Sequence, residues 1–484
     1  MRLLEALRKI ESEKLHVFHM PGHKRHPKFM NLLDGILELD ITEIPGADHL
    51  HDSKSCLLET RRTIEQMYNS YQSRILVNGS TVGILSMIMG CLAEGQGVLI
   101  NRNAHKSVYN ALEIGKLKPY FYSPQYDGEL GIVTEYDTDE IFRVLASKTD
   151  IGAVVLTYPT YEGLCYDIKS IIDYCHGRDI LVLVDEAHGA HFVLSESYPK
   201  SALELGADIV IHSFHKTLPA MTQTACLHFG KSMLKRPELI DSVDYYLKSL
   251  QTSSPSYPLM ASIDAMLMIM TEDGKLLSKQ LTERTKAMYE ALSDLKTLSL
   301  YRFDVQDLTK IIIRVNPEFY KKGQWDGEVL SKRLRSQYRI QVEYETDLML
   351  LCMSSISSSQ DDFDALVKAL LELDYERSKT YDANPIEVIQ SDSAAIKHLY
   401  GEMLKPENQI LLPHQVRRMP YELIPVEHAM NRISADYVIP YPPGIPICIP
   451  GERVTASTIN LIERLSRHIM GEDGLIKVLL LDRA

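Results

Sequence analysis

Short apolar runs alternate with amphipathic segments between Tyr71 and about Phe229. The apolar runs predict strands at Arg74–Val77, Val98–Asn101, Pro119–Tyr122, Ala153–Thr157, Ile180–Val184 and Ile209–His212. Between them, residues 104–115, 138–147 and 168–178 have the apolar spacing of helices. Short strands that alternate with helices of this length indicate a mainly parallel sheet, buried under helices on both faces. We therefore expect an α/β fold.

The pattern changes on either side of this segment, and the length of 484 residues suits two to four domains. Strand-like runs at Lys310–Val315, Ile340–Tyr344 and Leu348–Met353, followed by a helix over 361–375, predict a smaller α+β domain. We expect a helix with an extended arm, a large domain that is mostly helical from 233 onward, the small α+β domain, and a C-terminal α+β domain, at residues 1–50, 51–295, 296–380 and 381–484.

Composition narrows the class of protein. A hydrophobic fraction of 45% with 24% charged residues is typical of a globular protein, and the net charge of -13 argues against nucleic-acid and anionic-membrane binding. Seven scattered cysteines without a C-x-x-C motif predict neither a disulfide framework nor a zinc ribbon. No signal peptide is evident, and the longest apolar run, Gly83–Ala93, is about half a membrane span. We expect a soluble, cytoplasmic protein.

Two candidate catalytic residues follow the last two predicted strands. Asp185 opens the motif DEAHG after one strand, and Lys216 closes the motif SFHK after the next. Ligands of open α/β sheets gather at such carboxyl ends. The pair suits pyridoxal phosphate, because a lysine forms a Schiff base with its aldehyde and a carboxylate keeps its pyridine nitrogen protonated. Taken singly, Asp185 suits a turn cap and Lys216 a solvated loop.

Two further strand ends carry candidate cofactor contacts. The segment NGSTVG at 78–83 follows a strand and opens a helix, so its backbone N–H groups and the hydroxyls of Ser80 and Thr81 can bind a phosphate. His105, in the segment NRNAHKS, follows the next strand, where its flat ring can stack on a flat cofactor. Either segment alone is also compatible with ordinary helix capping.

Taken together, the four strand ends carry a phosphate loop, a stacking ring, an acid and a Schiff-base lysine, in that order. This order resembles the large domain of the fold-type I pyridoxal-phosphate enzymes, which have the aminotransferase-like fold. More narrowly, the chain resembles the ornithine/lysine/arginine decarboxylase family over nearly its whole length. The other matching motifs are HMPGHK at 19–24, IPGAD at 44–48, SSPSY at 253–257 and YPPGIPICIPGE at 441–452.

The resemblance implies a role for each matching residue around pyridoxal 5'-phosphate. Lys216 would carry the cofactor, and Asp185 would pair with its pyridine nitrogen. Ala187 and His105 would pack on opposite faces of the ring. The phosphate would be held by Ser80, Thr81, Ser213 and His215. Ser253 would reach the phosphate of the neighbouring subunit, which makes a homodimer the smallest active unit.

The substrate side of the site is implied less directly. His188 stands where some larger members have tryptophan; it would contact the substrate carboxylate or support the ring, and either His188 or Lys216 would reprotonate Cα. Glu452 would pair with the distal cation of the substrate, unless it is an ordinary surface residue. His23 and Lys24 would line the entrance. Six histidines, at 16, 19, 23, 26, 49 and 51, show no ligand spacing, so we expect no metal.

The implied reaction is decarboxylation of arginine, lysine or ornithine to the amine and carbon dioxide. The motif-bearing arm starts near His16, so we expect a short form without the receiver-like domain of larger members. Such a form favours polyamine biosynthesis over acid resistance, and a dimer or a differently packed tetramer. Two alternatives remain: another fold-type I enzyme, such as a lyase or an aminotransferase that binds the substrate carboxylate through Arg314 or Arg333, and a non-catalytic protein that only binds the cofactor.

Overall fold

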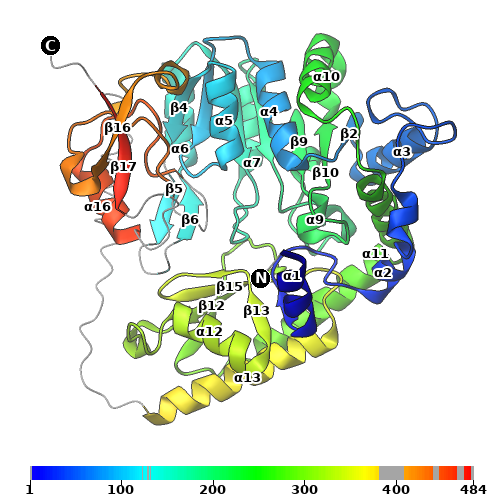
Figure 1. Ribbon diagram of the computed structural model, residues 1–484, viewed down its shortest axis with the longest axis vertical. Coiled ribbons are helices and arrows are strands. Elements are labelled where there is room, and N and C mark those ends of the chain that lie inside the picture. The colour runs from blue at the N-terminus through cyan, green and yellow to red at the C-terminus, as the bar shows by residue number, and fades with distance from the viewer. Residues whose placement is uncertain are drawn as a thin grey trace.

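A seven-stranded sheet forms the centre of the protein (Figure 1). The computed structural model describes residues 3–122, 124–127, 130, 132–380, 408–439, 446–465 and 474–480. The strand order is β2-β10-β9-β8-β7-β3-β4. In chain order these strands are β2 Gln72–Leu76, β3 Gly97–Asn101, β4 Lys118–Tyr122, β7 Ile151–Thr157, β8 Leu181–Asp185, β9 Ile209–His212 and β10 Ala225–Phe229. The six predicted strands match six of these to within two residues at either end.

The direction of the strands decides where their ends meet. Neighbouring strands from β4 to β9 are parallel, whereas β10 is antiparallel to both β9 and β2. Two successive reversals make β2 run in the same direction as β9. The carboxyl ends of β2, β3, β7, β8 and β9 therefore lie along one edge. The mainly parallel sheet of an α/β fold is confirmed; the antiparallel strand β10 was not predicted.

Helices cover both faces of the sheet. The helices between the strands are α4 Gly79–Cys91, α5 Lys106–Ile114, α6 Thr138–Ser147, α7 Ile168–His176, α8 Ala202–Leu205 and α9 Phe214–Thr217, with α10 Pro237–Leu250 after the last strand. One apolar core lies between the sheet and α4, α5 and α10. The core of the opposite face continues from α7 and α3 Cys56–Tyr68 into α11 Tyr257–Ala291 and the small domain.

Glycines allow α4 to lie buried between the sheet and α10. A Cβ on Gly83 would lie 2.6 Å from Leu76 Cδ1, and a Cβ on Gly90 would lie 2.7 Å from Val243 Cα. The helix is apolar on all sides because both of its faces are covered. Its first turn is thereby held at the ligand-binding edge of the sheet.

The small domain is a four-stranded antiparallel sheet with two helices, and Figure 1 shows it at the end of α11. Its strands lie in the order β11-β12-β15-β14, with bounds Leu298–Tyr301, Lys310–Val315, Met349–Met353 and Tyr344–Glu345. Its helices are α12 Gly327–Tyr338 and α13 Gln360–Thr380. The predicted strand over 340–344 is divided, because β13 Ile340–Val342 pairs instead with β1 His16–Phe18 of the N-terminal arm.

The N-terminal arm links the two domains, and the remaining described chain forms a C-terminal unit. The arm contains α1 Leu3–Ser12, β1 and α2 Pro27–Leu32. The C-terminal unit contains the antiparallel strands β16 Tyr421–Pro425 and β17 Leu475–Leu479 and the helices α15 Pro413–Val416 and α16 Ala456–Leu465. Separately, the large domain contains a hairpin formed by β5 Pro124–Asp127 and β6 Ile132–Tyr136. Residues 441–445 of the YPPGIPICIPGE motif lie outside the described residues. The bounds of the four predicted domains stay predictions. None of the described helices is long and apolar enough to cross a membrane.

Replacing Gly90 with Val tests the close packing of α4. The new side chain would meet the backbone of α10, so we expect a loss of about 1–3 kcal/mol in the free energy of unfolding. Ser86 of the same helix is a matched control, because its buried hydroxyl has no hydrogen-bond partner among the described residues and Ser86→Ala should cost little. Thermal unfolding measures the Tm of both variants. A Tm of Gly90→Val equal to that of Ser86→Ala would contradict the close packing of α4 against α10.

Candidate active site

Three sequence-predicted residues meet at the carboxyl edge of the sheet. Asp185 is the last residue of β8, and Lys216 lies in α9, the short helix that follows β9. His105 follows β3 and caps α5. Desolvation lowers the pKa of His105, while the charges of Asp185 and Lys216 act on it in opposite directions. Charges influence one another this way only at short range. The structure therefore brings these three side chains together.

Lys216 contacts His188 directly. The Lys216 Nζ lies 3.0 Å from His188 Nε2. Burial lowers the pKa of Lys216, and the negative charge of Asp185 opposes that shift. Burial, reinforced by Lys216 and Lys310, holds the pKa of His188 well below its usual range. His188 is therefore neutral at physiological pH, and its Nε2 can accept a hydrogen bond from the Lys216 ammonium group.

The strand end that carries Asp185 is held by a buried network that sequence reasoning missed. Asp185 Oδ1 accepts a hydrogen bond from Ala187 N at 3.1 Å. Glu186 accepts from Ser201 Oγ at 2.8 Å and lies 2.8 Å from His212 Nε2. His212 in turn contacts His228 Nε2 at 3.1 Å. These contacts tie β8, β9 and β10 together directly behind Asp185 and Lys216. The only sequence signal is a charged residue inside an otherwise buried run.

The start of α4 is the candidate phosphate-binding end of the site. Gly79 has a φ of +74° and donates its N–H to Gln223 O at 2.9 Å, which turns the chain sharply into the helix. Asn78 makes no side-chain cap hydrogen bond, so the helix N-terminus that bears Ser80 and Thr81 can accept an anion. Across the edge, Ser213 is fully buried, and its hydroxyl has no hydrogen-bond partner among the described residues.

The remaining predicted cofactor contacts are His105, Ala187 and His215. His105 Nδ1 lies 2.8 Å from Ser107 Oγ, which fixes the orientation of the ring. Ala187 is buried in the segment that follows Asp185. His215 Nδ1 lies 2.8 Å from Thr224 O, and burial lowers the pKa of His215 to about 4, so this side chain is a neutral hydrogen-bond donor. The contact of His215 with a phosphate stays a prediction.

These residues fit pyridoxal phosphate. The orphaned Ser213 hydroxyl and the uncapped start of α4 suit its phosphate. The Asp185 carboxylate suits the pyridinium nitrogen, and a lysine with a lowered pKa suits the aldehyde. Ala187 and His105 are the candidates for the two ring faces.

The N-terminal arm closes over the lysine loop. Gly22 N donates to His215 O at 2.7 Å, and a Cβ on Gly22 would lie 2.8 Å from Leu218 O. Lys24 Nζ donates to Met353 O at 3.0 Å, and burial lowers the pKa of Lys24 to about 7. The HMPGHK motif therefore packs against the segment around Lys216 rather than extending into solvent. An entrance role for His23 and Lys24 stays a prediction.

A second buried cation lies near the site and was not predicted. Lys310 Nζ donates to Asp307 Oδ2 at 3.2 Å, and Asp307 Oδ1 lies 3.0 Å from His191 Nε2. The positive charge of Lys310 lowers the pKa of both Lys216 and His188. Lys310 begins the apolar strand β12 of the small domain, so its nearness to Lys216 depends on how the two domains pack.

Glu452 reaches the neighbourhood of the site but contacts the protein itself. Its two carboxylate oxygens accept from Arg102 Nη1 and Nη2, each at 2.7 Å, and both side chains are buried. Arg102 lies three positions before His105 in the loop after β3. The ion pair therefore fastens the C-terminal unit to a loop of the site. A contact between Glu452 and substrate stays a prediction.

Ser253 lies at the phosphate end of its own chain. It is exposed, and the adjacent Thr252 N donates to Asn78 Oδ1 at 3.3 Å. The reach of Ser253 to a neighbouring subunit stays a prediction. Of the two arginines considered for an aminotransferase, Arg333 pairs with Glu376 at 2.6 Å, and Arg314 lies within β12. In the described part of the chain, no cluster of His, Cys, Asp and Glu is suited to a metal ion.

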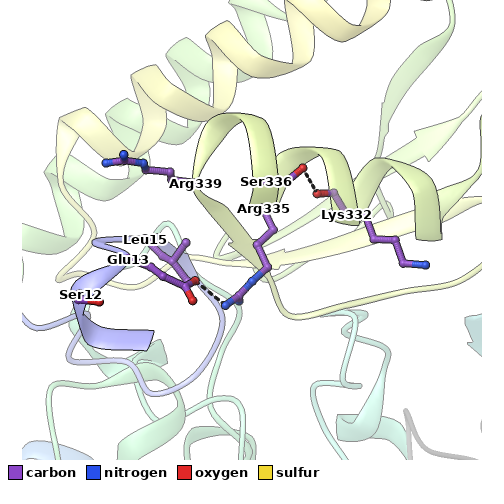
Figure 2. A pocket seen from close by; sticks show the side chains of 7 residues that line it. All are labelled: Ser12, Glu13, Leu15, Lys332, Arg335, Ser336 and Arg339. Atoms are coloured by element: carbon purple, nitrogen blue, oxygen red, sulfur yellow. Dashed lines mark hydrogen bonds and ion pairs between the residues drawn. The ribbon is translucent and has the colours of Figure 1, made fainter. Parts of the chain in front are cut away.

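A groove of about 570 Å³ lies elsewhere on the described part of the chain. It is lined by Ser12, Glu13, Leu15, Lys332, Arg335, Ser336 and Arg339. Figure 2 shows Arg335 directed at Glu13, which it contacts at 2.6 Å, and Lys332 is paired with Glu328. Its lining includes no residue of the Lys216 site. The groove is a surface feature between the arm and α12.

Solved structures show the class of fold. The structure of the Escherichia coli constitutive lysine decarboxylase superposes with a TM-score of 0.73 at 20% identity, over 95% of this chain and 79% of that chain. The Sphingomonas wittichii serine palmitoyltransferase superposes with a TM-score of 0.58 at 12% identity, over 75% and 88%. The fold is that of the fold-type I pyridoxal-phosphate enzymes.

The family follows from the sequence comparisons. Residues 2–355 match the family described as Orn/Lys/Arg decarboxylase, major domain, and residues 394–469 match its C-terminal domain. An arginine decarboxylase of Bacillus subtilis (strain 168) is 30% identical over 95% of this chain and 92% of that protein. The constitutive lysine decarboxylase of Escherichia coli (strain K12) is 24% identical over 95% and 76%. The chain belongs to the Orn/Lys/Arg decarboxylase family and is a pyridoxal-phosphate-dependent amino-acid decarboxylase.

Replacing Lys216 with Ala should remove both turnover and the covalent cofactor linkage, because no other amine is held against His188 in the described site. Borohydride reduction followed by peptide mass spectrometry measures the linkage. Lys231→Ala is the matched control, since this exposed lysine should leave the labelled peptide unchanged. A cofactor label on Lys216→Ala protein would contradict the assignment.

Replacing Glu452 with Gln should destabilise the protein, because it leaves the buried Arg102 without its counter-charge. We expect a loss of about 3–5 kcal/mol, and the double change Arg102→Met with Glu452→Met should recover part of it. Thermal unfolding measures the loss. The KM of the folded single variant checks the other role: a large rise in KM at unchanged Tm would mean that Glu452 binds substrate instead.

Proposed function

We propose that this enzyme decarboxylates a basic amino acid, namely arginine, lysine or ornithine, and that arginine is its preferred substrate. The observation that carries the proposal is the Lys216–Asp185 pair at adjacent strand ends of a chain that belongs to this family. Arginine is favoured because four of the similar proteins, from Bacillus and Halalkalibacterium species, are named arginine decarboxylases at 29–30% identity.

The chemistry divides between the cofactor and the chain. Bound pyridoxal phosphate supplies an electron sink for the charge that forms at Cα when carbon dioxide leaves. Asp185 keeps the pyridine nitrogen protonated, because its negative charge stabilises the cation. Lys216 would hold the cofactor through its aldehyde. The start of α4 and Ser213 anchor the phosphate.

The proton that replaces the carboxylate at Cα comes from the His188–Lys216 pair. Their nitrogens lie 3.0 Å apart. Burial holds the pKa of His188 well below its usual range, so the Lys216 ammonium group is the proton donor of the pair and neutral His188 accepts its hydrogen bond. The arm and the small domain cover this pair, which keeps bulk water away from the reacting carbon. We propose Lys216 as the immediate proton donor to Cα and His188 as the group that orients it.

Three finer points stay predictions: a role in polyamine biosynthesis, a homodimer as the active unit, and a cytoplasmic location. Membership of the family supports these three predictions, but it does not establish any of them for this chain. The dimer is the most direct to check, because the predicted role of Ser253 requires a second subunit at the phosphate.

A panel of amino acids tests the reaction. The cofactor-loaded protein should release carbon dioxide and the matching amine from arginine fastest, and keto acid should not accumulate. Asp185→Asn is the matched control, since it should retain the cofactor yet lose most of the rate. Keto-acid formation at the expense of carbon dioxide would identify an aminotransferase, and a faster rate with lysine or ornithine would overturn the choice of arginine.

A further inference from the structure

Two adjacent residues of the large domain face two adjacent residues of the small domain. Tyr161 and Glu162 lie in the loop that follows β7, and Glu343 and Tyr344 lie between β13 and β15. The Tyr161 hydroxyl donates to Glu343 Oε1 at 2.6 Å, and the Tyr344 hydroxyl donates to Glu162 Oε1 at 2.8 Å. The two ring centroids are 5.6 Å apart. Each domain therefore donates one hydroxyl hydrogen bond to the other and accepts one in return. We call these four residues the clasp.

The Tyr344–Glu162 half of the clasp is buried and structural. Both side chains are about 6% exposed. Burial raises the pKa of Glu162, and the Tyr344 hydroxyl opposes that shift. The same loop is joined to the small domain by its backbone, because Asp307 N donates to Gly163 O at 2.9 Å and Cys165 N donates to Val305 O at 3.0 Å. This half holds the two domains in contact.

The Tyr161–Glu343 half of the clasp extends to the active site. The Tyr161 ring lies edge to face on His188, with centroids 4.8 Å apart and planes at 61°. His188 Nε2 contacts Lys216 Nζ. On the other side, Glu343 Oε2 accepts from Met20 N of the N-terminal arm at 2.8 Å. A continuous set of contacts thus runs from the arm, through the small domain and Tyr161, to the catalytic lysine.

His188 has few other restraints. Its Nδ1 has no hydrogen-bond partner among the described residues, so its ring is oriented by Lys216 on one edge and by Tyr161 against its face. Besides Lys216, the charged or titratable groups that act on it are Lys310, His215 and His105. A shift of the Tyr161 ring would therefore change the distance between His188 and Lys216.

We propose that Tyr161 is a positioning residue for the His188–Lys216 pair, and that its hydrogen bond to Glu343 makes this position depend on contact between the two domains. Tyr161 acts through His188 and touches no reacting atom itself. The Tyr344–Glu162 bond holds the domains together without contacting the pair. The two halves of the clasp therefore differ in role although their hydrogen bonds are alike.

Tyr161→Phe tests this role, with Tyr344→Phe as the matched control. Each change removes one phenol hydroxyl from the clasp and keeps the ring. The pH midpoint of the visible absorbance of the cofactor-loaded protein reports the protonation of the Lys216 linkage and needs no substrate. We expect Tyr161→Phe to move this midpoint and to lower kcat about tenfold at nearly constant KM. Tyr344→Phe should lower Tm by as much as Tyr161→Phe does, but it should leave the pH midpoint unchanged.

A double-mutant cycle completes the test. In a His188→Asn background, Tyr161→Phe should have no further effect on kcat, because the residue through which it acts is gone. Additive losses, an unmoved midpoint in Tyr161→Phe, or an equal shift in Tyr344→Phe would each overturn the proposal. Only the kcat measurement rests on the proposed substrate. If no amino acid is turned over while the midpoint moves as expected, the proposed function fails and the positioning role stands.

Discussion

The active site depends on one constraint: the Lys216 amine must be withdrawn from water while a negative charge remains close to it. Burial favours the neutral amine that the aldehyde of the cofactor requires, and Asp185 limits how far the pKa falls. His188, 3.0 Å away, is kept neutral by the same burial and by the surrounding cations. A parallel sheet meets this constraint because it delivers Asp185 and Lys216 from adjacent strands to one edge.

The rest of the molecule maintains that environment. The large domain provides the edge, and the network from Glu186 through His212 to His228 fixes the strands behind it. The arm and the small domain cover the amine from the other side. The C-terminal unit is fastened to the loop before His105 by the Arg102–Glu452 ion pair. Each part thus contacts a segment that carries a site residue, and none contributes the whole site.

Much of the large domain could be predicted because its signals are local. A buried parallel strand is a short apolar run, and a helix between strands shows its own period, so six strands of the central sheet were found to within two residues. Lys216 and Asp185 could be proposed as site residues from the sequence because both follow such runs. The strand β10 was missed, since nothing in the run ACLHF at 225–229 indicates that it is antiparallel to its two neighbours. The division of 340–344 was missed for a similar reason, because β13 pairs with an arm more than three hundred residues earlier.

The sequence by itself determined the order of the elements, the residue types at the strand ends and the membership of the family, because these depend on local pattern and on motifs that can be read in one dimension. Only the tertiary structure decided which distant residues act on the lysine. Lys310 and Glu343 have no motif, and they reach the site because the small domain packs against the large domain, where Tyr161 contacts both Glu343 and His188. It also decided that Glu452 pairs with Arg102. Such contacts depend on distances between segments far apart in the chain, and no local pattern encodes them.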